Sequence, residues 1–143
     1  MEEIFKHTVK IQPRFNDFDI MGHVNNALYF SYFDIGKTGY FKKVWGRYIN
    51  WREVGLVIAH VESDFLSQIV MNEPISVQTT VSKIGNRSLR LAQRIINTTT
   101  KEVKATCETV MVGFDIDENR VDSITARCVG AISDYEGKVY KRD

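Results

Sequence analysis

The sequence is poor in proline and cysteine, with two of each among 143 residues. Cys107 and Cys128 have no close spacing, which excludes a zinc cluster and a disulfide framework. We expect two buried free thiols, with one disulfide as the alternative. The two prolines, Pro13 and Pro74, stand far apart, and neither a repeat nor a low-complexity stretch is present. The length suits one hydrophobic core, so we predict a single domain over residues 1–143.

The sequence has 19 Lys and Arg residues and 18 Asp and Glu residues, so neither sign of charge dominates and the formal net charge is +1. A chain without a basic field is not expected to bind nucleic acid. No apolar run reaches the roughly 18 residues of a membrane-spanning helix. The N-terminal MEEIFKHTVK carries acids where a signal peptide needs bases. These absences predict a cytoplasmic protein with no membrane span.

What the sequence does contain is one long aromatic helix, predicted from about Asn26 to Val44. Its apolar residues return at helical spacing and form one face: Tyr29, Phe33, Gly36, Tyr40 and Val44. Asn25 or Asn26 is expected to cap the helix start. Gly36 and Gly39 each cost a helix about 1 kcal/mol relative to alanine, which indicates that its backbone closely approaches a neighbouring element.

The remaining segments are predicted strands. His7 to Phe15 forms the first one, at an edge or with a bend, because Pro13 lacks a backbone donor. From Leu56 onward apolar residues alternate with polar ones, which places Phe65 and Ile58 on opposite faces of their strand. Further alternating runs occupy about 75–82, 88–95 and 103–111, with a two-residue hairpin at Gly85-Asn86. Residues 97–101 and 115–119 are predicted turns, 45–52 a loop, and 123–135 a short amphipathic helix. This order predicts an α+β fold with the helix on one face of an antiparallel sheet.

The helix start follows a distinctive polar stretch, RFNDFDIMGHVNNALYFSYFDIGK, with the pattern R-x-x-D-x-D-x-x-G-H-V-N-N-x-x-Y-x-x-Y-x-D. It is carried by Arg14, Asp17, Asp19, Gly22, His23, Val24, Asn25, Asn26, Tyr29, Tyr32 and Asp34. The pattern strongly resembles the hot-dog-fold acyl-CoA thioesterases of the 4-hydroxybenzoyl-CoA thioesterase type. FLSQIVMNEPISVQTTVSKIGNRSL resembles the second and third strands of that family, with the turn that follows them. The resemblance implies a curved antiparallel sheet of about five strands wrapped around one long helix, in homodimers or homotetramers with active sites at the dimer interface.

Hydrolysis of a thioester needs an attacking group and a donor for the oxyanion that develops. By resemblance, Asp19 attacks the carbonyl directly or acts as general base on a water, and the sequence leaves both routes open. The backbone amide of Asn26 is implied as the oxyanion donor, since a helix start offers unpaired amides and a positive dipole end. The alternative for Asp19 is a turn-capping role, because Asp-x-x-Gly is good turn chemistry. Asp17 is expected to bind loop amides.

The acyl group is expected to contact the loop and the helix face. The predicted substrate-binding residues are Gly22, His23, Val24, Asn25, Tyr29, Phe33 and Asp34, with Ile58 as a further candidate from the sheet. Several have a structural alternative: His23 as a loop residue, Asn25 as the helix cap, and Asp34 as partner of Lys37 three residues on. Asp34 and Lys37 stand where the family usually has glutamate and arginine.

Coenzyme A carries phosphates, which bind cations. Basic residues surround the predicted turn at Gly85-Asn86, and we call this region the basic turn. It supplies the predicted coenzyme A contacts, which are Lys83, Arg87, Ser88 and Arg90. The alternative is that this turn is a solvated surface. Neither a metal nor a cofactor is predicted, and coenzyme A enters only as part of the substrate. We therefore expect an acyl-CoA thioesterase. An acyl carrier protein thioesterase and a non-catalytic acyl-CoA-binding module stay open. A hot-dog hydratase or dehydratase is disfavoured because its catalytic motif differs.

Overall fold

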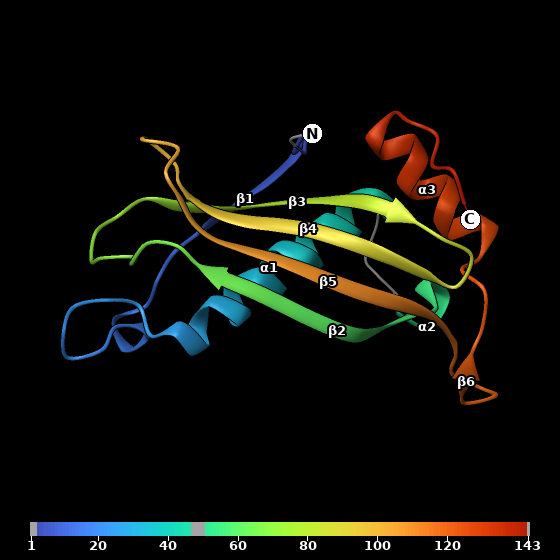
Figure 1. Ribbon diagram of the computed structural model, residues 1–143, viewed down its shortest axis with the longest axis horizontal. Coiled ribbons are helices and arrows are strands. Elements are labelled where there is room, and N and C mark those ends of the chain that lie inside the picture. The colour runs from blue at the N-terminus through green and yellow to red at the C-terminus, as the bar shows by residue number, and fades with distance from the viewer. Residues whose placement is uncertain (1–2, 47–50, 143) are drawn as a thin grey trace.

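The computed structural model describes residues 3–46 and 51–142. Five strands form one antiparallel sheet in the order β1-β3-β4-β5-β2 (Figure 1). They are β1 (His7–Ile11), β2 (Leu56–Phe65), β3 (Ile75–Ile84), β4 (Ser88–Asn97) and β5 (Val103–Asp115). A two-residue strand, β6 (Arg120–Val121), pairs with the end of β5. The helices are α1 (Asn26–Trp45), α2 (Trp51–Val54), α3 (Ala126–Glu136) and a 3₁₀ turn at Phe15–Asp17. The predicted α+β arrangement of one long helix on a curved sheet is confirmed.

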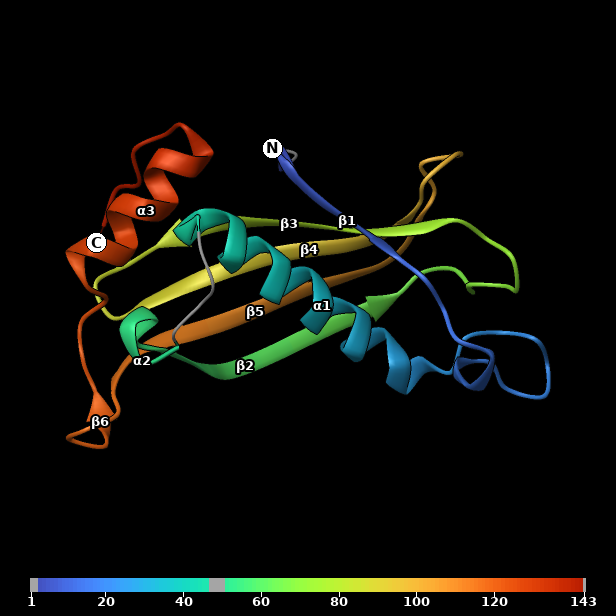
Figure 2. The same cartoon turned by 180° about the vertical axis from the view of Figure 1, so that it is seen from behind.

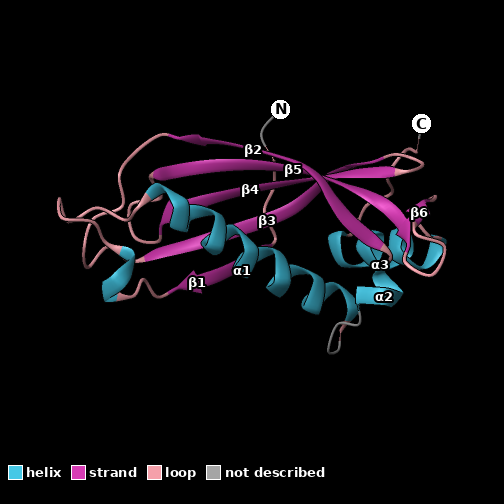
Figure 3. Cartoon of the chain, turned by 90° about the horizontal axis from the view of Figure 1, so that it is seen from below, coloured by secondary structure: helices cyan, strands magenta, loops and turns pink. Residues whose placement is uncertain are grey.

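α1 lies across the concave face of the sheet, and α3 packs against one end (Figures 2 and 3). The side chain of Asn25 accepts the amide of Ala27 and so caps the start of α1. Gly46 ends the helix in the left-handed conformation, with φ of 67°. The predicted apolar face is confirmed, because its first four residues are buried, and Val44 is half-buried.

The two glycines inside α1 mark its closest approach to the sheet. A Cβ on Gly36 would lie 2.5 Å from Cγ1 of Val77 in β3. A Cβ on Gly39 would lie 2.9 Å from Cγ2 of Val9 in β1. Both distances are too short for a real side chain, so glycine at these positions lets the helix backbone rest directly on the strands.

β2 is the edge strand with the most exposed side chains. Among the strands of residues 3–46 and 51–142 it pairs only with β5, and its pairing shifts between Ile58 and His60. This bulge corrects the predicted alternation: Ile58 pairs with Met111 and lies on the same face as Phe65, not on the opposite one. Both side chains are nearly half exposed, at 48% and 44%.

Other elements depart from the prediction at their ends. The first strand stops at Ile11, and β1 is an edge strand as expected for a segment that runs into Pro13. The predicted loop at 45–52 is wrong at its two ends, because α1 includes Trp45 and α2 begins at Trp51, and right at Gly46, which follows α1. Residues 47–50 lie outside the described part. The turn after β3 has three residues, 85–87, and Gly85 is not in the left-handed region that the predicted two-residue turn requires.

The two cysteines are buried and free, as expected. The C-terminal helix is also confirmed, with Thr125 as its cap. Among the helices of residues 3–46 and 51–142, none combines the length and apolarity that crossing a membrane requires.

Candidate active site

The loop between the 3₁₀ turn and α1 folds into a small hairpin. Phe18 and Val24 form an antiparallel bridge, and the amide of Asp19 donates to the carbonyl of His23 at 2.8 Å. At the tip, the amide of Gly22 donates to the carbonyl of Asp19 at 3.0 Å, and Gly22 has φ of 80°. Glycine is the residue that adopts this conformation without steric cost. The loop therefore holds its shape through its own backbone.

The carboxylate of Asp19 is part of this turn and is exposed to solvent. Its Oδ1 accepts the amides of Met21 at 2.9 Å and His23 at 3.2 Å. These two hydrogen bonds show that Asp19 caps the turn, which was the alternative role predicted for it. They use one carboxylate oxygen and fix the orientation of the group, so that the turn role and a chemical role for Oδ2 are compatible.

The base of the loop is anchored by a second carboxylate. Asp17 is only 2% exposed, and its Oδ2 accepts the hydroxyl of Tyr32 at 2.6 Å. The backbone and guanidinium of Arg14 donate to the same carboxylate. Burial alone would raise the pKa of Asp17, but these hydrogen bonds outweigh it and hold the pKa below its usual range. Asp17 is thus a charged, fully engaged structural group, as predicted.

The segment between β2 and β3 supports the loop from the other side, which the sequence analysis did not foresee. The amide of Val24 donates to the carbonyl of Ile69 at 2.9 Å, and His23 bridges to Val70. The hydroxyl of Tyr29 accepts the amide of Ile69 at 3.2 Å. No local pattern signals these contacts, because they join residues 40 to 47 positions apart.

The start of α1 faces the same loop. The Asn25 side chain satisfies the amide of Ala27 at 3.0 Å. Asn26 follows as the first helical residue, whose amide belongs to the orphan donors of a helix start. A carboxylate on a rigid turn and a helix-end amide therefore lie at the two ends of one short segment, 19–26. Such a pair can attack a carbonyl and stabilise the resulting oxyanion.

The structure divides the predicted substrate residues into two groups. Gly22, His23 and Asn25 lie on the loop and are at least partly exposed. Val24, Tyr29 and Phe33 belong to the core, at most 2% exposed, so in this chain a direct contact between them and a substrate stays a prediction.

Asp34 lies further along α1. Its carboxylate pairs with the buried Lys37 at 3.4 Å, and its side chain is 70% exposed. The expected ion pair is therefore present. Asp34 also borders a hollow of about 440 Å³ beside the 3₁₀ turn, lined mainly by apolar surface.

The predicted coenzyme A contacts gather at the turn between β3 and β4. Lys83, Arg87, Ser88 and Arg90 line a hollow of about 380 Å³, and Arg90 also pairs with Glu108. This turn lies at the opposite end of the sheet from the Asp19 loop (Figure 1). Each of the strands between them has ten residues, about 30 Å at roughly 3.3 Å per residue. Within one chain the two groups are therefore far apart.

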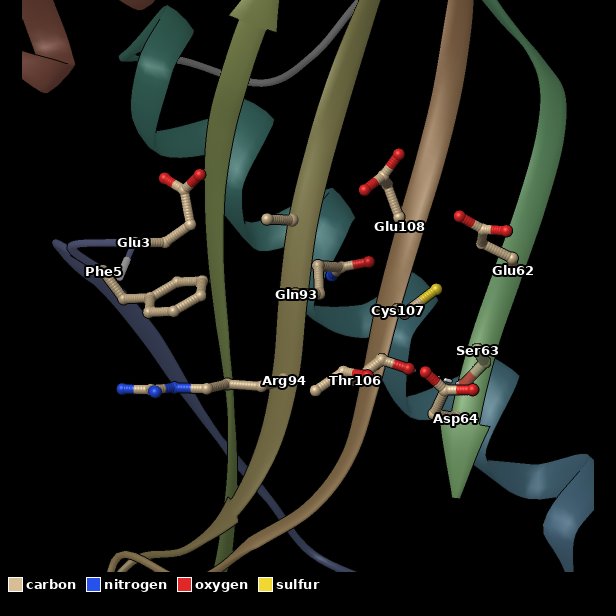
Figure 4. Close-up of a pocket in the computed structure, with 11 residues that line it drawn as sticks. Glu3, Phe5, Glu62, Ser63, Asp64, Gln93, Arg94, Thr106, Cys107 and Glu108 are labelled. Atoms are coloured by element: carbon tan, nitrogen blue, oxygen red, sulfur yellow. Dashed lines mark hydrogen bonds between the residues drawn. The ribbon is translucent and has the colours of Figure 1, made fainter. Parts of the chain in front are cut away.

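Another hollow, of about 420 Å³, lies on the face of the sheet away from α1 (Figure 4). It is bordered by acidic side chains, Glu62 and Asp64 from β2 and Glu108 from β5, and by the guanidinium of Arg94, 4.5 Å from the ring centre of Phe5. None of the predicted site residues lines it. Within 3–46 and 51–142, no three His, Cys, Asp or Glu side chains gather as a metal site would require.

A single long helix held in a curved antiparallel sheet, with polar groups at the helix start, defines the hot-dog class of proteins. A family model described as "Thioesterase-like superfamily" matches residues 13–131, and the chain belongs to that superfamily.

Two solved structures support this placement. A thioesterase from Thermus thermophilus, complexed with coenzyme A and Zn, is 27% identical and covers 94% of this chain and 96% of its own, with a TM-score of 0.83. A predicted thioesterase from Bacillus stearothermophilus is 26% identical, with a TM-score of 0.79, and the match covers 94% of this chain and 97% of that one.

A curated relative, the uncharacterized protein YsmA of Bacillus subtilis (strain 168), is 33% identical over 82 residues. That match spans 57% of this chain and only 55% of the relative. The match therefore supports an evolutionary relationship over about half of each protein.

Proposed function

We propose that this protein is an acyl-CoA thioesterase, which hydrolyses the thioester of an acyl-CoA to a free acid and coenzyme A. The observation that carries the proposal is the Asp19 carboxylate, oriented by two loop amides and placed seven residues before the helix-end amide of Asn26. Membership of the thioesterase-like superfamily supports the reaction type. The Thermus structure, which contains coenzyme A, supports the choice of carrier.

In this account the thioester carbonyl oxygen accepts the amide of Asn26, and the positive end of the α1 dipole stabilises the oxyanion. Oδ2 of Asp19 acts at the carbonyl carbon in one of two ways. As nucleophile, it forms an anhydride and expels coenzyme A as thiolate, and water then releases the acid. As general base, it takes a proton from a water that attacks the carbonyl. A single turnover in ¹⁸O-water identifies the nucleophilic route when water attacks the aspartyl carbon of the anhydride, because the first molecule of acid then carries an oxygen of Asp19. Attack at the acyl carbon gives the labelling of the general-base route.

We further propose that the complete site forms in a homodimer. β2 has a free edge and exposed apolar side chains, including Ile58, Val61 and Phe65, which a monomer would leave in water. If two β2 strands pair antiparallel about a two-fold axis, the Leu56 end of one lies beside the Phe65 end of the other. The basic turn is at the Leu56 end, where the amide of Gly113 reaches the carbonyl of Arg87.

Such a dimer brings the basic turn of one subunit to the end of the sheet that carries the Asp19 loop of the other. This arrangement resolves the separation of the two groups within one chain. The phosphates of coenzyme A would then bind Lys83 and Arg87 of one subunit while the thioester reaches Asp19 of the next.

The test is thiol release from acetyl-, hexanoyl-, palmitoyl- and benzoyl-CoA, followed by a thiol reagent, with an acyl carrier protein loaded with hexanoate as a parallel substrate. The proposal expects release from at least one acyl-CoA at a higher kcat/KM than from the acyl carrier protein. Binding of acyl-CoA without thiol release would instead show a binding module. Preference for the acyl carrier protein would contradict coenzyme A as carrier.

A further inference from the structure

The carboxylate of Asp17 has more hydrogen-bond donors than a simple surface turn requires. Oδ2 accepts the amide of Arg14 at 3.0 Å and the hydroxyl of Tyr32 at 2.6 Å. Oδ1 accepts Nε and Nη2 of Arg14 at 3.2 and 3.1 Å. Arg14 belongs to the same turn as Asp17, whereas Tyr32 belongs to α1. The tyrosine hydroxyl therefore links two separate elements.

Asp17 is also where both ends of the catalytic loop are fastened. The loop leaves Asp17 at Phe18, and it returns at Asn25, whose amide donates to the carbonyl of Asp17 at 2.9 Å. Packing does not hold the tip, because the side chains of Ile20 and Met21 are 100% and 73% exposed. The direction in which the loop projects from α1 therefore depends on the hydrogen bonds at its base, together with the contacts of His23 and Val24 with Val70 and Ile69.

We propose that Tyr32 is a positioning residue for Asp19: through Asp17, its hydroxyl fixes the 18–24 loop against α1, so that the Asp19 carboxylate and the Asn26 amide keep their relative place. The inference rests on the proposed function of Asp19 as the reacting group. Tyr32 itself is 3% exposed and touches no reacting atom. Its effect reaches the chemistry only through the loop.

The chain offers a matched control for this hydrogen bond. Tyr40 lies on the same buried face of α1, is fully buried, and donates its hydroxyl to Oε2 of Glu136 at 2.6 Å. Its bond has the same length and the same chemistry as the bond from Tyr32, but it joins α1 to α3, away from the loop. Tyr32→Phe and Tyr40→Phe each remove one phenol–carboxylate bond and preserve the aromatic ring.

The first measurement compares kcat and KM of the two variants on whichever panel acyl-CoA the wild type hydrolyses fastest. Misplacement of a catalytic group by a fraction of an ångström to 1 Å lowers turnover on the order of ten- to a hundredfold. We expect a fall of that size in kcat for Tyr32→Phe, with KM within about twofold, and wild-type kcat for Tyr40→Phe. Unchanged kcat in Tyr32→Phe, or an equal loss in both variants, overturns the proposal.

The pH profile adds a readout that a purely structural role would not move. Because the Tyr32 hydroxyl stabilises the charged form of Asp17, its removal raises the pKa of that carboxyl. Asp17 then takes up its proton at a higher pH, and the loop loses its anchor there. The acid limb of kcat is expected to shift upward in Tyr32→Phe and to stay in place in Tyr40→Phe; an unshifted limb in both contradicts the inference.

Amide hydrogen exchange of residues 19–25 decides the matter without activity. We expect exchange at least about tenfold faster in Tyr32→Phe than in the wild type, and unchanged in Tyr40→Phe. Equal protection in all three proteins refutes the role of Tyr32 in holding the loop. If the wild type releases no thiol from any substrate, the proposed function fails, while the exchange data still show whether Tyr32 fixes the loop.

Discussion

Nζ of Lys104 lies 2.6 Å from Oε2 of Glu73; the Lys104 side chain is buried, at 5% exposed, and the Glu73 side chain is partly buried, at 13%. The pair joins β5, which lies between β4 and β2, to the segment before β3, which carries the Ile69 contacts of the Asp19 loop. Lys104 also donates to the carbonyl of Gln68 at 3.1 Å. This one cation therefore supports the segment against which the Asp19 loop rests.

Lys104→Met is predicted to destabilise the protein by about 2 kcal/mol or more, because it removes the cationic partner of a partly buried carboxylate, which keeps its hydrogen bonds from the Val70 amide and Asn97. Urea unfolding measures the effect. Asp117→Asn is the control, since the pair between Arg52 and Asp117 is exposed on both sides and its loss is expected to cost less than about 1 kcal/mol. Equal losses in the two variants would contradict a buried role for Lys104.

The same cluster predicts how stability depends on pH. Burial alone would raise the pKa of Glu73, but hydrogen bonds from Lys104, the Val70 amide and Asn97 outweigh it and lower the pKa. A carboxyl with a lowered folded-state pKa stabilises the protein above its unfolded pKa, and this stability is lost as the pH falls through the folded value. The melting temperature should therefore drop from about pH 5 downward. Glu73→Gln should melt lower near neutral pH and show a shallower acid dependence; an equally steep dependence would refute the assignment.

Gly36→Ala is predicted to destabilise the fold because the added Cβ would lie 2.5 Å from Val77 Cγ1. Overpacking costs about 1–3 kcal/mol, which is at least as large as the about 1 kcal/mol that alanine gains in a helix. The control is Gly130→Ala in α3, where a Cβ meets nothing within 4 Å. That variant should gain about 0.5–1 kcal/mol in unfolding free energy. A stabilised Gly36→Ala protein would show that α1 and β3 are not in close contact.

The free edge of β2 predicts the oligomeric state. Wild type should elute as a dimer or larger assembly with light-scattering detection, and Ile58→Lys should shift it toward monomer, because an unpaired charge would be buried at the interface. Ile116→Lys is the control, since Ile116 is similarly exposed, at 43%, but lies in the turn before β6. A monomeric wild type, or a dimer unaffected by Ile58→Lys, contradicts the proposal that the complete site forms between two subunits.

Periodicity in the sequence was sufficient to predict α1 and the long strands. A helix that returns aromatic residues every three or four positions, and strands that alternate, carry their signal locally. Gly36 and Gly39 correctly indicated close backbone contact, because glycine inside a helix has a cost that something must offset. The bulge at Ala59 was not predictable in this way: it depends on how β2 pairs with β5, and it moved Ile58 to the other face.

The candidate site was only partly visible in the sequence. The turn chemistry of Asp19 and the capping role of Asn25 follow from short-range spacing, and both are present. The roles of the tyrosine hydroxyls are set by partners far along the chain: Tyr29 with Ile69, and Tyr32 with Asp17. Such partners are known only once the fold brings them together, so the sequence indicated aromatic faces but not their hydrogen bonds.

The central claim is that Asp19 carries the chemistry, and Asp19→Asn tests it most directly. The substitution keeps an oxygen for the turn amides and removes the reactive carboxylate. Asp115→Asn is the control, because Oδ1 of Asp115 also accepts two turn amides, from Asp117 and Glu118 at 3.0 and 3.1 Å, in a remote turn. With both variants folded, thiol release from the best acyl-CoA should fall by about a hundredfold or more in Asp19→Asn and stay at the wild-type rate in Asp115→Asn. Wild-type activity in Asp19→Asn would contradict the account.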